Sequence, residues 1–440
     1  MVSKISTREM NALKALPRNT QQCAIRALHG SVADLRLVVK NLPPSREHRI
    51  HLIPVFHALL DASRIPEVTM AGSDVEHITN ILLAKEAFLG VMIVSGDAGD
   101  DEADADPIVT RFVTSKWDML FPWMQFFAHQ LSAAWRNPSM DASFKLTMFD
   151  AVKICIQTLR TICEFSSDGR RLFRTTPAIQ NYFVQLWIMI GTMPSDRKVE
   201  AVSPVFKTYH VMGTLRSSLA GVAVAALHDR SLLPSLMRLA GGATTFVSMA
   251  LKYVRRMTRE LQSLVSLLSP NKSQPQDVHA DEYCISMVIG FSHAIEFIFL
   301  ISEISNSCRE LLLEMGSMHT VAIAISCIWP KFVSDSIHYH PTQQLPRVEL
   351  EKRRSLIRAC FRYVNFVLYH ADNSVSALDE ALKTDLLESI NRAINIPYRN
   401  HGTEQPLVEP ACRNSFHSSP VFRFPDYHEE APTQPRTHAH

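Results

Sequence analysis

The sequence is poor in glycine, in paired cysteines and in excess charge of either sign. Only 14 of its 440 residues are glycine, less than half of the usual ~7%. All-β folds need glycine in their many tight turns, so this scarcity argues against them. The eight cysteines include no Cys-x-x-Cys pair, which argues against a zinc site and favours free, buried thiols in a reducing compartment. We therefore expect an intracellular protein, in the cytoplasm or the nucleus.

The charges are balanced. Lys and Arg number 45, Asp and Glu number 43, and the net charge is +2, so the chain as a whole has no general attraction to nucleic acid or to an anionic membrane. Residues 1–9 contain no apolar signal region. The most apolar stretch, 285–304, contains His293, Glu296 and Glu303. Charges in the middle of a span are costly, so we expect a buried helix there and no membrane span.

Signatures of catalysis are also missing. The chain has no G-x-S-x-G, P-loop, G-x-G-x-x-G or H-E-x-x-H motif, and we expect no catalytic residue, no metal and no cofactor. His338 and His340 share an expected loop that has no acidic or cysteine partner. His293 and Glu296 are three residues apart on an apolar helix, where a hydrogen-bonded polar pair is more common than an acid/base couple. The acidic stretch 96–107 lacks the glycine and the glutamate that an EF-hand requires, which favours a mobile loop.

Helical periodicity covers most of the chain. Apolar residues recur at i, i+4 and i+7 from 144 to 162, and Ser31 with Asp34 resembles a capping box. The longer expected helices are 197–228, 244–269, 277–305, 347–371 and 374–395. A polar linker lies near 269–276. The tail, 397–440, contains seven prolines that no helix can span, and we expect it to be disordered.

Two distant segments match without a gap. Residues 170–184 and 309–323 each show a short helix with apolar residues, a Pro or Gly corner and a longer apolar helix. Looser copies surround Gly241-Gly242 and Gly30. Armadillo repeats begin in this way, although a helical bundle without repeats gives part of the same pattern.

The predicted fold is therefore all-α, an armadillo/HEAT-like right-handed helical solenoid with a disordered C-terminal tail. Its predicted parts are an N-terminal helical region over 1–95, the acidic mobile loop over 96–107, armadillo-like repeats over 108–396 and the disordered Pro/His-rich tail over 397–440.

The first third of the chain resembles the N-terminal helical region of a group of fungal proteins that usually carry a C-terminal MYND-type zinc finger. The resemblance rests on LPRN (16–19), AIRA (24–27), GS (30–31), LIPVF (52–56), LD (60–61), IP (65–66) and WDMLFPWMQFF (117–127). The resemblance implies a role in protein interaction. A MYND finger requires several paired cysteines and a Cys/His pair, and the tail contains only Cys412. No zinc ligand is therefore carried over, and the chain looks either like a relative that has no finger or like the product of a gene model that lost its last exon.

Two basic clusters are the candidate partner-binding residues. They are Arg354, Arg358 and Arg362, at i, i+4 and i+8 of one helix, and Arg255, Arg256 and Arg259. Solenoids bind extended partners along rows of helices, so we expect a non-enzymatic scaffold that binds proteins through acidic segments. One alternative is a nucleic-acid-associated or transcription-related protein that uses basic helices 252–259 and 347–362, and another is an enzyme whose site has no linear signature. A solvated basic face balanced by Glu349 and Glu351 is the structural alternative.

Overall fold

The structure is a computed structural model, and it is helical apart from one short hairpin. It describes residues 11–67, 75–96, 111–192 except 112 and 138, 205–267, 278–326, 347–372, 375–376, 379, 382, 397–400 and 403–406. The elements of the first half are α2 (Arg18–Leu28), α3 (Val32–Lys40), α4 (Arg46–Ile50), α5 (Ile53–Leu59), η1 (Ala62–Arg64), α6 (Val75–Gly96), α8 (Trp117–Arg136), α9 (Ala142–Phe165), α10 (Ser167–Thr175) and α11 (Pro177–Thr192). Those that follow are α12 (Val205–Leu227), η3 (Arg230–Leu232), α13 (Leu233–Leu239), α14 (Ala243–Leu267), α15 (Val278–Ile304), α16 (Asn306–Glu314), an unlabelled helix Ser317–Ser326, α18 (Arg347–His370), β1 (Pro397–Asn400) and β2 (Thr403–Pro406).

The all-α prediction is confirmed at this level, and one part of the tail prediction needs correction. Inside the segment expected to be disordered, β1 and β2 pair antiparallel, with Pro397 opposite Pro406 and Asn400 opposite Thr403. The strands are only four residues long, and proline occupies an outer end of each, where a missing N–H costs the ladder least. Residues 97–107, the linker 269–276 and residues 407–440 lie outside the described residues.

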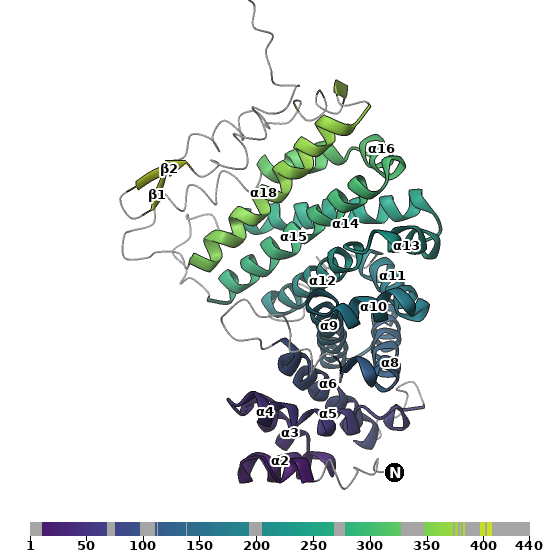
Figure 1. Cartoon of the computed structure of the whole chain (residues 1–440), viewed down its shortest axis with the longest axis vertical. Helices are drawn as coiled ribbons and strands as arrows, with labels where there is room; N and C mark the ends of the chain where they lie inside the picture. The colour runs from purple at the N-terminus through teal and green to yellow at the C-terminus, as the bar shows by residue number, and fades with distance from the viewer. Residues whose placement is uncertain are drawn as a thin grey trace, which may run out of the picture.

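The long helices pack in chain order. α9 lies against α6 and α12, α12 lies against α15, and α15 lies against α18. On the second layer, α11 contacts both α8 and α14. Figure 1 shows the same order as a stack that rises from the N-terminal helices α2–α5 to α18. Two steps of the stack, α9–α10–α11 and α12–α13–α14, each consist of a long helix, a short corner helix and a second long helix.

The predicted glycine corners are confirmed. Gly30, Gly241, Gly242 and Gly316 have φ of +104°, +91°, +113° and +77°, in the left-handed region that side chains with a Cβ disfavour. Gly241 and Gly242 follow the seven-residue α13 and precede the long α14, as predicted, whereas the prediction of a longer second helix is wrong at Gly30, because α3 (nine residues) is shorter than α2 (eleven residues). Half of the expected capping box forms: the amide of Asp34 donates to Ser31 Oγ at 3.3 Å, but the Ser31 N–H donates to the Arg26 carbonyl at 3.1 Å, and it is the Ser31 hydroxyl that donates to the Asp34 carboxylate at 2.6 Å.

The gapless match between the two segments extends to equivalent contacts 139 residues apart. α9 ends at Phe165 and α15 at Ile304, and the serines that follow, Ser166 and Ser305, cap α10 and α16 by accepting the third amide of the helix. Arg170 then donates to the Cys163 carbonyl at 3.3 Å, and Arg309 donates to the corresponding Ser302 carbonyl at 3.5 Å. The two corners therefore share their local construction as well as their sequence pattern.

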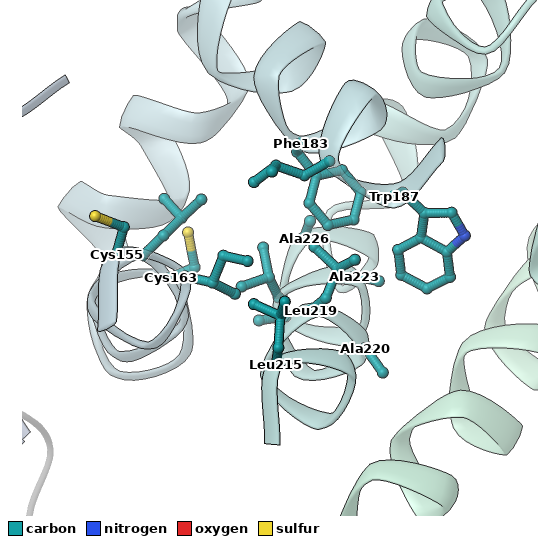
Figure 2. Close-up of a cluster of buried hydrophobic side chains, with 14 of the residues drawn as sticks. Cys155, Cys163, Phe183, Trp187, Leu215, Leu219, Ala220, Ala223 and Ala226 are labelled. Atoms are coloured by element: carbon teal, nitrogen blue, oxygen red, sulfur yellow. The ribbon is translucent and has the colours of Figure 1, made fainter. Parts of the chain in front are cut away.

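One cluster of buried apolar side chains extends along the described chain from Leu13 to Ala371. Figure 2 shows part of it, with Cys155 and Cys163 on α9 and with Leu215 and Leu219 on the neighbouring α12. Both thiols are free and buried, and burial raises the pKa of the Cys163 thiol to about 12. This is the small-hydrophobe role expected for these cysteines.

Small residues let the helices approach closely. A Cβ on Gly290 of α15 would lie 2.7 Å from Cβ of Ser217 on α12, so these helices meet almost backbone to backbone. Trp187 of α11 then fills the space between layers, with its ring 4.7 Å from that of Tyr253 on α14 and 4.8 Å from that of Phe297 on α15.

Two helices are long and apolar enough to span a membrane by length and composition alone, over Val75–Ser95 and Met287–Ile304. Of these windows, 56% and 72% are buried among neighbouring helices. Burial among the neighbouring helices accounts for much of this apolar character, more fully for Met287–Ile304 than for Val75–Ser95.

The helix α6 connects the N-terminal helices to the rest of the stack. Arg36 of α3 pairs with Glu86 at 3.0 Å, and Lys85 pairs with Asp150 of α9 at 3.0 Å. Two of the stretches that carry the family resemblance also meet, because the Trp123 indole N–H donates to the Asp61 carbonyl at 3.2 Å.

Candidate partner-binding site

The first predicted basic residue, Arg255, lies between elements. Its Nε donates to Thr320 Oγ1 at 3.2 Å, and its Nη2 donates to the carbonyl of Met315. The guanidinium thus ties α14 to the corner at Gly316, and it is only partly exposed. This placement gives Arg255 a structural contact that sequence reasoning missed, because the two partners lie 60 and 65 residues further along the chain.

The next residue, Arg256, belongs to a buried ionic cluster. Its Nε donates to Glu260 at 3.3 Å, and the same carboxylate accepts from Arg216 of α12, which is 2% exposed. Tyr253 donates its hydroxyl to the Arg216 carbonyl, and burial raises the pKa of Tyr253 well above its usual value. The cluster joins α12 to α14, while Arg259 remains exposed on the outside of α14.

The second basic cluster lies where α15 and α18 meet. Arg358 and Arg362 are both exposed, and the side chain of Arg354 lies outside the described residues. The guanidinium carbon of Arg362 lies 4.1 Å from the ring centroid of Phe299 on α15, a cation–π contact. The structure therefore brings Arg358 and Arg362 to one exposed helix face, and it assigns the Arg362 head a contact with α15.

Within the described part of the chain, no three His, Cys, Asp or Glu side chains gather in a way that could hold a metal ion. His338 and His340 lie outside that part. Nδ1 of His293 is buried without a hydrogen-bond partner among the described residues. Burial, together with the nearby Arg160, lowers the pKa of His293 to about 4, so this imidazole is neutral at pH 7.

A groove between α8 and α11 is lined by both polar and apolar residues among those described. Its volume is about 500 Å³. The lining residues are Gln125, Ala128, His129, Ser132, Trp135 and Arg136 of α8, and Ala178, Asn181, Tyr182, Gln185, Leu186, Ile188 and Met189 of α11. Each helix contributes residues at i, i+3, i+4 and i+7, the spacing of one helix face.

The floor of the groove is held by aromatic contacts. The ring of Trp135 lies 5.5 Å from Phe149 of α9, edge to face, and the ring of Tyr182 lies 5.8 Å from Phe121 of α8. The Tyr182 hydroxyl is buried and has no hydrogen-bond partner among the described residues. Such contacts fix the shape of the groove before anything binds, which lowers the ordering cost of binding.

The walls and one end of the groove are polar. Gln125, Asn181 and Gln185 are exposed amides, and Arg136 is an exposed cation at the last residue of α8. The described residues that line the groove include no acidic side chain. The sequence analysis missed this site because its residues belong to two helices 40 or more positions apart; the only available signal was the identical spacing on 125–136 and 178–189.

Comparison with known proteins adds no relative: no family model, no curated protein and no solved structure matches this chain. The fold and the groove therefore define only a class, an all-α protein built from helices stacked in chain order.

Proposed function

We propose that this chain is a non-enzymatic, armadillo-like helical scaffold that binds protein partners. The observation that carries the proposal is the preformed groove between α8 and α11, which combines an apolar floor with exposed amides. Concave sites with this mixture of a fixed apolar surface and a few polar groups are typical binding sites.

The solenoid part of the proposal is supported by the order of packing. Each long helix contacts the corresponding helix of the next step, and two corners 139 residues apart share a capping serine and an arginine–carbonyl bond. Repetition of one supersecondary unit is what defines a solenoid. We propose that the hand is right-handed, as in armadillo repeats.

The non-enzymatic part is supported by where the perturbed groups lie. The thiols of Cys163 and Cys360 have their pKa raised to about 12 by burial, and the pKa of His57 is lowered to about 4 by burial and by Lys116. These groups lie in helix–helix packing, and in the groove itself burial raises the pKa of Tyr182 well above its usual value, which keeps that hydroxyl protonated. Catalysis usually gathers such groups in a cleft.

The setting that we propose is intracellular, and the resemblance of the first third to the helical region of fungal MYND-type proteins agrees with a role in protein interaction. The exposed Arg358 and Arg362 offer a second contact surface for an acidic segment. The alternative that uses nucleic acid is weaker, since Arg255 and Arg256 are committed to internal contacts.

The test is a peptide-display selection against the purified 440-residue chain, followed by synthesis of the enriched peptides and fluorescence polarisation with each. We expect enriched peptides with micromolar dissociation constants, and binding that changes little when salt is raised. If repeated selections enrich nothing above an unrelated helical control protein, the scaffold proposal is wrong. A steep loss of binding with salt to a phosphate-backbone probe, single-stranded DNA, would instead favour the nucleic-acid alternative.

A further inference from the structure

The geometry points to one kind of occupant for the groove between α8 and α11: an extended peptide segment of four to five residues that carries one acidic and one large apolar side chain. This inference deepens the proposed function and rests on it. It also differs from the sequence expectation, because the groove lies on the layer formed by α8 and α11, away from both basic clusters.

The length of the segment follows from the helices. The lining residues run from Gln125 to Arg136 on α8 and from Ala178 to Met189 on α11, and eleven steps of about 1.5 Å each give a groove about 16 Å long. An extended chain rises about 3.3 Å per residue, so about five residues fit from end to end.

The extended conformation follows from the polar groups. Gln125, Asn181 and Gln185 each offer two N–H donors and a carbonyl acceptor, and their side chains form no hydrogen bond with the described residues. An extended segment presents unpaired main-chain N–H and C=O groups that such amides can satisfy. A helical ligand has already paired its main chain, so it offers these amides only its side chains.

The side-chain preference follows from the floor and from the charge. Trp135, Leu186 and Met189 form an apolar surface that takes a leucine- or phenylalanine-sized side chain. Arg136 is exposed, His129 lies on the same face, and the lining contains no acidic residue among those described. An acidic side chain on the ligand therefore meets only complementary charge, whereas a lysine in its place meets repulsion.

The test uses a panel of fluorescein-labelled pentapeptides that contain one Leu or Phe and, at a second position, Asp, Asn or Lys. Fluorescence polarisation with the full chain is the measurement. We expect the order Asp, then Asn, then Lys, with about three- to tenfold between Asp and Asn, because exposed ion pairs are modest. R136E should reverse the preference for Asp over Lys, and Arg238→Glu, a matched change at an exposed arginine of α13, should leave it unaltered.

Two further variants test the place and the conformation. Ala178→Trp fills the groove from the exposed second residue of α11 and should abolish binding of every peptide. Thr244→Trp, at the exposed second residue of α14, is its matched control and should bind normally. A peptide with a single N-methylated amide should lose about tenfold in affinity, and the loss should vanish in a Gln185→Leu variant if that amide is its partner.

The outcomes separate the inference from the proposed function. If peptides from the display selection bind normally to Ala178→Trp, the chain binds partners elsewhere, so the groove inference is wrong while the scaffold proposal stands. Equal affinity for the Asp and Lys peptides would refute the acidic preference. Insensitivity to N-methylation at every position, together with helical circular dichroism of the bound peptide, would refute the extended conformation.

Discussion

The corner after α10 and the corner after α16 both turn the chain from a short helix into the next helix, but different residues form the two turns. Pro177 begins α11 in the first, and Gly316 with φ +77° occupies the corresponding place in the second. In the first, Gln180 of α11 donates to the Phe173 and Arg174 carbonyls at 3.0 and 2.9 Å. In the second, Arg255 reaches across from α14 to the Met315 carbonyl.

This comparison separates the positions that hold equivalent residues in both corners from those where the residues differ. A helix end leaves carbonyls that need donors, and any side chain within reach is able to supply them. The capping serine, the arginine that follows it and the buried apolar positions are the same in both corners. The side-chain donor to the carbonyls at the helix end is local in one corner and remote in the other.

The largest expected effect tests whether the two corners are equivalent in the core. Phe173 and Leu312 are 1% and 0% exposed at matching positions. Truncation to alanine leaves a cavity, and we expect losses of about 3–5 kcal/mol for Phe173→Ala and about 2–5 kcal/mol for Leu312→Ala. Urea denaturation monitored by circular dichroism measures both.

The control for this pair is Arg171→Ala, an exposed residue of α10 whose ion pair with Asp168 is on the surface. It should change stability by less than about 0.5 kcal/mol. If only one of the two core truncations destabilises the chain, the equivalence of the corners fails.

The second prediction concerns the remote donor. Arg255→Met keeps the apolar stem and removes both hydrogen bonds, which leaves the Met315 carbonyl and Thr320 Oγ1 without this donor. We expect a loss of about 1–3 kcal/mol. Hydrogen exchange of the amides around 315–320 should speed up, while exchange at the first corner stays the same.

Lys252→Met, an exposed position on the same helix, serves as its control and should leave exchange unchanged. Equal exchange in Arg255→Met and in the wild type would show that the second corner does not depend on α14.

These two corners also show how far the sequence could predict the structure. The expected helix 244–269 is found as Ala243–Leu267, and 277–305 as Val278–Ile304, because apolar spacing reports which face a helix buries. Gly316 was recognised as a corner from its neighbours alone. The role of Arg255 was not, since a charged residue on an amphipathic helix looks the same in sequence whether it faces water or a distant carbonyl.

The groove could not be predicted from the sequence for a related reason. Gln125, Ser132 and Asn181 are ordinary surface residues in the sequence, and only the packing of α11 beside α8 makes them opposite walls of one site. The prediction that His293 and Glu296 form a polar pair likewise used only residues that are neighbours in the sequence. It did not include Arg160 of α9, which the fold brings near His293.

The third prediction uses the matching positions on α9 and α15, where Ile154 corresponds to His293. The pKa of His293 is lowered to about 4 by burial and by Arg160, against about 6.5 in the unfolded chain. Below pH 6.5 the unfolded state therefore binds more protons, so stability falls as the pH drops from about 6.5 to about 4. His293→Ile should reduce this loss by about 1–3 kcal/mol at pH 4.

Thermal melting between pH 4 and 8 gives the comparison. His57, whose pKa is also lowered to about 4, is present in both proteins, so the informative quantity is the difference between the two pH profiles. Profiles that run parallel over this range would show that His293 titrates in the folded protein much as it does in the unfolded chain.

The smallest expected effect on stability distinguishes the glycine of the second corner from the proline of the first. Gly316 needs a left-handed backbone, and its N–H donates to the Leu313 carbonyl at 2.8 Å. We expect Gly316→Ala to cost about 1 kcal/mol, and Gly316→Asn to cost less, because asparagine adopts that conformation more readily. Pro177 needs no left-handed backbone, so Ala and Asn at 177 should each cost about 0.5 kcal/mol and should not differ. Thermal melting of the four variants measures this contrast, and an equal cost for Ala and Asn at 316 would mean that the second corner tolerates an ordinary backbone, as the first one does.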